Sequence, residues 1–104
     1  MDFTVDELLL EQARLEATLA EVVPRAGQGC SAEFRRRFEG HLRSLRPMLA
    51  SDDLAVAVDT LEAAERVLEA ADPAAPLLML GMARDTLAGV VRRQANGWRL
   101  RAAA

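Results

Sequence analysis

The sequence predicts an all-α protein, an up-down antiparallel bundle of four helices in which residues 1–104 form a single domain. Apolar residues make up 51% of the chain and are mainly Ala and Leu, with no Ile or Tyr, a composition that favours helices over strands. They recur at intervals of three and four residues, and segments containing Pro or Gly divide them into four stretches. A chain of this length suffices for one core but not for two domains.

The first helix is expected over residues 4–23. Thr4 and Glu7 have the spacing of a capping box, and Phe3 precedes them where a hydrophobic staple packs against the first turn. Pro24 ends the helix because proline cannot donate a backbone hydrogen bond. The face predicted to pack on a neighbouring helix consists of Val5, Leu8, Gln12, Leu15, Leu19 and Val22.

The second helix is expected over residues 31–50, after a loop that contains Gly27 and Gly29. Ser31 is a favourable N-cap residue. Pro47 lies inside the apolar pattern and removes a backbone donor, so we expect this helix to be kinked or broken near Pro47. The core face consists of Phe34, Phe38, Leu42, Leu45 and Leu49.

The third helix is expected over residues 52–71, because Ser51 and the two acids after it form a start signal and Asp72-Pro73 stops the helix. It carries apolar residues on two roughly opposite sides. One side consists of Leu54, Val58, Leu61, Leu68 and Ala71. The other side consists of Val56, Ala63, Val67 and Ala70. Such a helix either contacts two neighbours within the bundle or leaves one side free for a partner.

The fourth helix is expected over residues 76–97, with Pro76 at its first position. The Asn-Gly pair at 96–97 is typical of a C-cap, after which Trp98 would fold back. The alternative is a helix that continues to residue 100. The core face consists of Leu80, Ala83, Leu87, Val90, Val91 and Trp98.

The formal net charge of −3 is the remainder of larger charges that alternate along the chain. Arg25 contributes one positive charge, and the net charge of the other segments is −5 over 2–23, +3 over 31–50, −6 over 51–72 and +4 over 73–101. Consecutive helices joined by short loops are normally antiparallel neighbours, so we expect each acidic helix beside a basic one. An exposed ion pair contributes only about 0–1 kcal/mol, so we interpret the alternation as selecting which helices pair.

The sequence lacks the signals of several protein classes. No apolar run approaches the ~18–20 residues of a membrane span, and the acidic N-terminal segment does not have the pattern of a secretory leader. Cys30 is the only cysteine, so no internal disulfide is possible and the cytoplasm is the expected location. We expect no cofactor and no metal site, because one His and one Cys fall short of any usual ligand set.

Cys30 and His41 have the chemistry for a reactive site. Cys30 precedes a helix start, where the helix dipole would lower the pKa of a thiol, but no base lies nearby in the sequence. His41 borders the apolar face of the second helix, and the residues after it do not match those that follow a phosphotransfer histidine. We interpret Cys30 as incidental and His41 as a packing residue. Paired carboxylates for acid–base catalysis need a pocket that holds them close, whereas nearly all acids here fall on polar helix faces. We therefore recognise no enzyme signature. The alternative is an enzyme that is active only within a larger complex.

More apolar residues are present than one stripe per helix requires. Leu10 lies off the core face of the first helix. Leu78 and Met82 lie about 160° from the core face of the fourth helix. Val56 and Val67 belong to the second strip of the third helix. These residues indicate a surface for association, unless the third helix is central in the bundle and only two or three of them stay exposed.

The sequence therefore predicts a non-catalytic protein-interaction module of the adaptor, chaperone or anti-activator type. It is expected to bind a partner segment or to form a homodimer through apolar contacts from the third and fourth helices, flanked by Arg92 and Arg93. The alternative is a nucleic-acid-associated regulator that uses the Arg-rich second and fourth helices. The acidic net charge and the lack of aromatic residues among those arginines weigh against this alternative.

Overall fold

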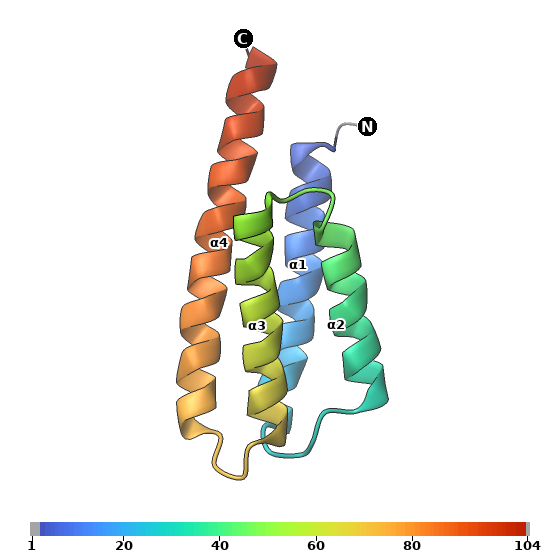
Figure 1. The fold of residues 1–104 in the computed structure, drawn as a ribbon, viewed down its shortest axis with the longest axis vertical. Helices are drawn as coiled ribbons and strands as arrows, with labels where there is room; N and C mark the ends of the chain where they lie inside the picture. The colour runs from blue at the N-terminus through green and yellow to red at the C-terminus, as the bar shows by residue number, and fades with distance from the viewer. Residues whose placement is uncertain (1–2, 104) are drawn as a thin grey trace.

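The computed structural model describes residues 3–103, which form an all-α bundle of four helices. Figure 1 shows that the chain reverses direction at each connection, so consecutive helices are antiparallel. The predicted fold class is therefore confirmed. The elements are α1 (Val5–Val22), the single-turn 3₁₀ helix η1 (Val23–Arg25), α2 (Ala32–Leu45), α3 (Ser51–Glu69) and α4 (Ala74–Ala103).

The four helices form a ring in which the acidic and basic helices alternate. The most extensive contact joins α3 to α4, and α1 contacts α2, α3 and α4. Helix α2 packs against α1 and α3 but makes no comparable contact with α4 in the described part of the chain, so the two basic helices lie at opposite corners. Within residues 3–103, the ion pairs that an arginine forms between helices follow this pattern: they are Arg37 with Glu21, Arg84 with Glu16, and Arg35 with Glu69. Each joins a basic helix to an acidic one, as the charge alternation predicts.

Two helix starts have the expected caps. The hydroxyl of Thr4 accepts a hydrogen bond from the backbone N–H of Glu7, whose side chain accepts one from the backbone N–H of Thr4. This is the predicted capping box. The hydroxyl of Ser31 accepts a hydrogen bond from the backbone N–H of Phe34 at 3.1 Å, which caps α2. Local sequence signals thus determine where these two helices begin.

The second helix is not a kinked helix over 31–50. Helix α2 ends at Leu45, and residues 46–50 form the turn into α3. Pro47 lacks the backbone donor that a further helical turn requires, so the helix stops before it. Two residues of this turn, Met48 and Leu49, are buried in the core. Their apolar side chains explain why the amphipathic pattern continues beyond the end of the helix.

The fourth helix is longer than expected at both ends. It begins at Ala74, where the carboxylate of Asp72 accepts a hydrogen bond from the backbone N–H of Ala74. It passes through the Asn-Gly pair at 96–97 without a cap and continues to Ala103. A glycine C-cap needs a positive φ, and Gly97 is not among the described glycines that adopt one. In Figure 1 the C-terminal turns of α4 extend beyond the ends of the neighbouring helices.

The loop between α1 and α2 closes the C-terminal end of α3. Gly27 and Gly29 have φ of +79° and +92°, which side chains with a Cβ rarely adopt. Their backbone N–H groups donate hydrogen bonds to the carbonyls of Val67 and Leu68 at 2.9 and 2.7 Å. These carbonyls are among the groups that the end of a helix leaves without an intrahelical partner. The glycine pair therefore links the first loop to the third helix.

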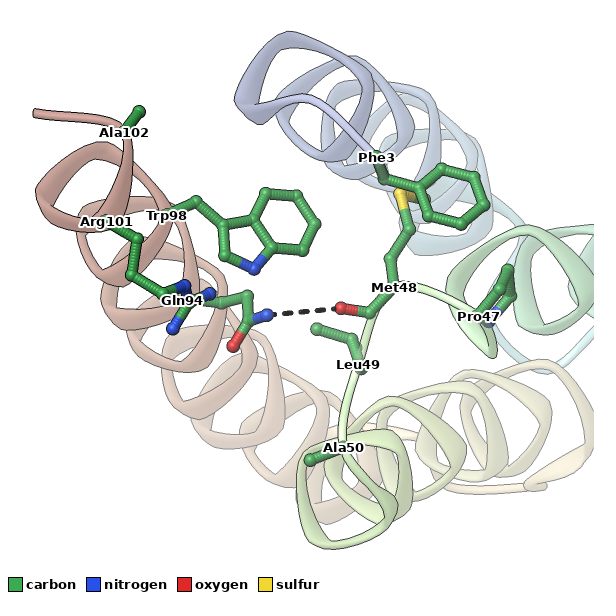
Figure 2. Close-up of a pocket in the computed structure, with 9 residues that line it drawn as sticks. All are labelled: Phe3, Pro47, Met48, Leu49, Ala50, Gln94, Trp98, Arg101 and Ala102. Atoms are coloured by element: carbon green, nitrogen blue, oxygen red, sulfur yellow. Dashed lines mark hydrogen bonds between the residues drawn. The ribbon is translucent and has the colours of Figure 1, made fainter. Parts of the chain in front are cut away.

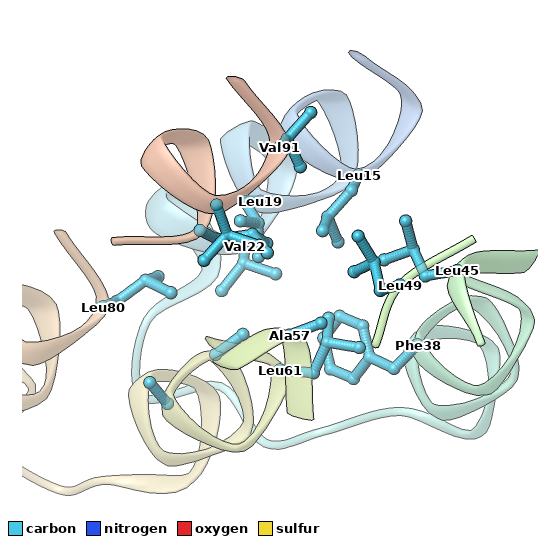
Figure 3. Close-up of a cluster of buried hydrophobic side chains, with 14 of the residues drawn as sticks. Leu15, Leu19, Val22, Phe38, Leu45, Leu49, Ala57, Leu61, Leu80 and Val91 are labelled. Carbon is cyan, nitrogen blue, oxygen red and sulfur yellow. The ribbon is translucent and has the colours of Figure 1, made fainter. Parts of the chain in front are cut away.

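Helix α3 does not expose a second apolar strip, which corrects the expectation from the sequence. Val67 is completely buried, and Val56 is partly buried against the core. Helix α3 contacts α4 on one side and α1 and α2 on others, so both of its apolar sides are covered within the chain. Figure 3 shows the buried cluster, in which side chains from all four helices meet, among them Leu19, Phe38, Leu61 and Leu80.

Candidate protein-interaction site

The first turns of α4 carry three adjacent apolar side chains on the solvent side of the bundle. The exposed fractions of Leu78, Met79 and Met82 are 73%, 52% and 71%. Residues three and four apart are neighbours on a helix surface, so the three side chains form one continuous patch. We call Leu78, Met79 and Met82 the α4 patch. Leu78 and Met82 are exposed as the sequence predicts.

Sequence reasoning missed Met79, because it lies between the core face and the outer face of α4. Its spacing of three residues from Met82 is the signal that identifies it. Gly81 lies beside the patch, and a Cβ at this position would meet no atom within 4 Å. The surface next to the apolar side chains is therefore open.

The structure does not bring the other predicted contact residues to the α4 patch. Leu10 is half exposed but lines a groove between α1 and the α2–α3 turn, together with Ser44 and Pro47. Arg92 and Arg93 are exposed in the second half of α4. Val56 and Val67 are covered, as described above. Of the apolar contact residues predicted from the sequence, the α4 patch therefore retains two.

A second group of side chains forms a polar network between α1 and α2. Glu11 is only 5% exposed, which corrects the expectation that the acids of the first helix are solvated. An oxygen of Glu11 lies 2.8 Å from Nδ1 of His41, and Nε2 of His41 lies 2.8 Å from the hydroxyl of Thr18. Arg37 donates a hydrogen bond to the same hydroxyl at 3.1 Å. His41 borders the core as predicted, but hydrogen bonds rather than apolar packing hold it.

The carboxylate, the imidazole and the hydroxyl of this network are connected in the same order as in a catalytic triad. The hydroxyl of Thr18 is not placed for attack, however, because the residue is only 2% exposed. It is also 3.2 Å from the backbone carbonyl of Arg14 and accepts the hydrogen bond from Arg37. A substrate carbonyl would have to displace these partners to reach the oxygen. The network fixes α1 against α2.

Arg37 also pairs with Glu21, on the solvent side of the same helix pair. The hydrogen bond from the guanidinium lowers the pKa of Glu21 and raises that of Arg37, because each charged group stabilises the other. One arginine thus joins a buried hydroxyl to an exposed carboxylate.

The surroundings of Cys30 shift the pKa of its thiol in the direction opposite to the one expected at a helix start. Burial raises the pKa of its thiol, and the carboxylate of Glu65 raises it further. A raised pKa reduces the fraction of reactive thiolate. The expected effect of the helix dipole does not dominate, and the environment of Cys30 supports its interpretation as an incidental cysteine.

A groove lies at the end of the bundle where α4 extends past its neighbours, and we call it the end groove. Its volume is about 660 Å³. Figure 2 shows Phe3 and Trp98 on its two sides, with the buried turn residues Met48 and Leu49 between them. The side chain of Gln94 donates a 3.5 Å hydrogen bond to the carbonyl of Met48, which ties α4 to the α2–α3 turn.

Within residues 3–103, no group of three or more His, Cys, Asp or Glu side chains is arranged to hold a metal ion. By length and composition, α4 is the one helix in this range that is long and apolar enough to cross a membrane. The mostly buried core helix of a soluble protein meets the same test, whereas 28% of the apolar stretch of α4 is buried; the buried residues of α4 include Leu80, Leu87 and Val91. Length and composition therefore do not assign α4 to a bilayer.

No family model, curated protein or solved structure matches this chain. The function is therefore inferred from the surface and the chemistry of the residues themselves.

Proposed function

We propose that the chain is a non-catalytic protein-interaction module, of the adaptor, chaperone or anti-activator type, which binds an amphipathic helix of another protein through the α4 patch. The observation that carries the proposal is the continuous exposure of Leu78, Met79 and Met82 on a helix whose other side is buried. Methionine side chains are flexible and accommodate apolar partners of varied shape. A helix with apolar residues at intervals of three and four would complement a patch with the same spacing.

The size of the patch suits a reversible contact. Complete burial of a Leu or Met side chain contributes about 1.5–3 kcal/mol. Leu78, Met79 and Met82 are already partly covered, and association itself costs several kcal/mol in lost freedom of motion. The patch would therefore act as the centre of an interface whose rim adds further contacts.

The non-catalytic part of the proposal is supported by the state of the titratable and nucleophilic groups. The hydroxyl of Thr18 is buried and its hydrogen bonds are satisfied, and the pKa of Cys30 is raised. The partly buried His41 serves to join α1 and α2. Each group that resembles reactive machinery thus has a structural explanation.

A photo-crosslinking amino acid in place of Met79 tests the proposal in cells that produce the protein. We expect an adduct with another protein, and its loss when Leu78→Asp and Met82→Asp are added. The same amino acid at Arg43, an exposed residue of α2, is the matched control. Equal adducts from both positions, or an adduct that survives both aspartates, would refute the proposal. An adduct with lipid instead of protein would show that the patch meets a membrane and would refute a protein helix as its partner.

One observation favours the nucleic-acid alternative. Four arginines of the second half of α4 take part in none of the ion pairs found within residues 3–103, and they are Arg92, Arg93, Arg99 and Arg101. Phosphate binding weakens steeply with salt, whereas apolar association does not. Titration of the protein with a duplex and a single-stranded oligonucleotide at low and high salt separates the two functions.

A further inference from the structure

We propose that the end groove binds the projecting end of α4 from a second copy of this chain, so that two copies form a reciprocal, two-fold symmetric dimer. The projecting end comprises residues 96–103 and is called the arm below. This proposal is independent of the α4 patch, which lies at the other end of the same helix.

The arm has apolar side chains on both of the sides that such a contact requires. Trp98 and Leu100 are two residues apart, which places them about 200° apart around the helix. Trp98 faces Phe3 across the groove, whereas Leu100 is 73% exposed. An arm inserted between these walls would place its own Trp98 against the resident Trp98 and its Leu100 against the resident Phe3. Two-fold symmetry makes the same contacts in both copies.

The groove has space for most of this occupant, and the rest of the arm would lie outside it. A helix with a diameter of about 10 Å and a pitch of 5.4 Å fills roughly 420 Å³ per turn. The groove volume of about 660 Å³ thus corresponds to about one and a half turns. The arm has eight residues, slightly more than two turns.

Charge complementarity favours a second copy as the occupant: the resident Arg101 lines the groove itself, and acids lie in the helix starts beside it. The arm carries Arg99 and Arg101 and no acid. Helices α1 and α3 begin beside the groove, where Phe3 and Ala50 line it, and their first turns contain Asp6, Glu7, Asp52 and Asp53. None of these six charges takes part in an ion pair found within residues 3–103. The basic arm of one copy would therefore meet the acidic rim of the other.

The acids also have a role in the monomer, because carboxylates stabilise the N-terminal turn of a helix. That role does not explain why the two arginines of the arm take part in none of the ion pairs found within residues 3–103. Nucleic acid is the other ligand that such arginines would attract, but it would be repelled by the acids on the rim. The second copy accounts for both sets of charges.

Sedimentation of the full chain at concentrations up to the high micromolar range tests the proposal. We expect the wild type to dimerise, and Leu100→Asp to weaken dimerisation by about tenfold or more, because a charge would enter an apolar contact. Leu100 is exposed in the monomer, so this variant is expected to fold. Leu78→Asp with Met82→Asp is the matched control, because it changes the α4 patch and should leave the dimer intact.

A charge exchange gives the second test. The variant R99E/R101E should not dimerise, and neither should D52R/D53R, but a mixture should form a one-to-one heterodimer in which both contacts are complementary again. Circular dichroism verifies that both variants fold. If D52R/D53R does not fold, the effect of Leu100→Asp on dimerisation decides whether the proposal holds.

Three results would overturn the proposal. The first is a wild type that remains monomeric at high micromolar concentration, including one that is monomeric and binds an oligonucleotide through its arginines. The second is a dimer that resists Leu100→Asp but is lost in L78D/M82D, which would assign self-association to the α4 patch. The third is two folded charge variants that fail to associate when mixed. If L78D/M82D still dimerises but no longer forms the crosslinked adduct at position 79, the result supports the dimer and the partner site on the α4 patch as separate contacts.

Discussion

The α1–α2 and α3–α4 pairs are both antiparallel, but different chemistry joins them. Between α1 and α2, the contact includes the network of Glu11, His41 and Thr18 and the ion pair of Arg37 with Glu21. No ion pair joins α3 to α4 within the described residues, although their contact is the most extensive in the bundle. The larger interface is thus the apolar one.

Small side chains let α3 and α4 approach closely. Ala57, Ala63 and Ala64 are buried on α3, and the hydroxyl of Thr60 lies 3.3 Å from the backbone carbonyl of Ala83 on α4. Such an interface gains stability from close packing over a large area. The polar network of α1 and α2 gains little net stability but tolerates only one alignment of its partners. We therefore expect α3–α4 to contribute more of the stability and α1–α2 to contribute specificity.

The largest effect is expected at the core of α4. Leu87→Ala removes a side chain that is almost fully buried and should lower the free energy of unfolding by about 2–5 kcal/mol, because it leaves a cavity. Urea unfolding followed by circular dichroism measures the change. A loss below that expected for His41→Leu would contradict the expectation that the apolar packing of α4 contributes more stability than the polar network.

The next effect is expected in the polar network. His41→Leu leaves the buried carboxylate of Glu11 without its imidazole partner and should cost about 1–3 kcal/mol. The same unfolding measurement applies. An unchanged midpoint would mean that Arg14, whose guanidinium lies 3.7 Å from Glu11, or water replaces the imidazole.

A smaller effect is expected when both partners are replaced. Glu11→Leu combined with His41→Leu removes the donor and the acceptor together, so the double variant should be more stable than His41→Leu alone. The specificity of the α1–α2 contact should decrease instead, and broader amide signals from these helices in NMR spectra would report it. A double variant less stable than the single one would show that the network contributes substantial stability.

The smallest effect is expected at the exposed ion pair. The folded-state pKa of Glu21 is lowered by Arg37, so the pair stabilises the protein above the ordinary pKa of glutamate and its contribution is lost as the pH falls through the lowered value. Glu21→Gln should therefore reduce stability slightly at neutral pH and not at strongly acidic pH. Thermal unfolding of both proteins across this range tests the prediction, and a difference that stays constant with pH would contradict it.

Much of the fold was predictable because its signals are local. The caps at Thr4 and Ser31 depend on residues three positions apart, and the apolar faces depend on helical periodicity. The sequence predicts a kink or a break near Pro47, because the missing backbone donor is visible in it. Whether the helix bends or ends depends on where Met48 and Leu49 can be buried.

The candidate site was less predictable. Leu78 and Met82 were identified because they lie opposite the core face of their own helix. The two apolar sides of its helix predict an exposed Val67, but the sequence does not reveal how many neighbouring helices cover these sides. The polar face of its helix predicts that Glu11 is solvated, and its contact with His41 is not predictable because the two residues are 30 positions apart in the sequence.

The sequence by itself determined that the protein consists of four helices, where the first two begin, and that acidic and basic helices alternate. These properties follow from capping, periodicity and charge within single segments. Only the tertiary structure decided that α3 is covered on both apolar sides, that Glu11 joins His41, and that α4 extends past the bundle to form the end groove. These properties depend on distances between segments far apart in the chain, and such distances are fixed only when the helices pack.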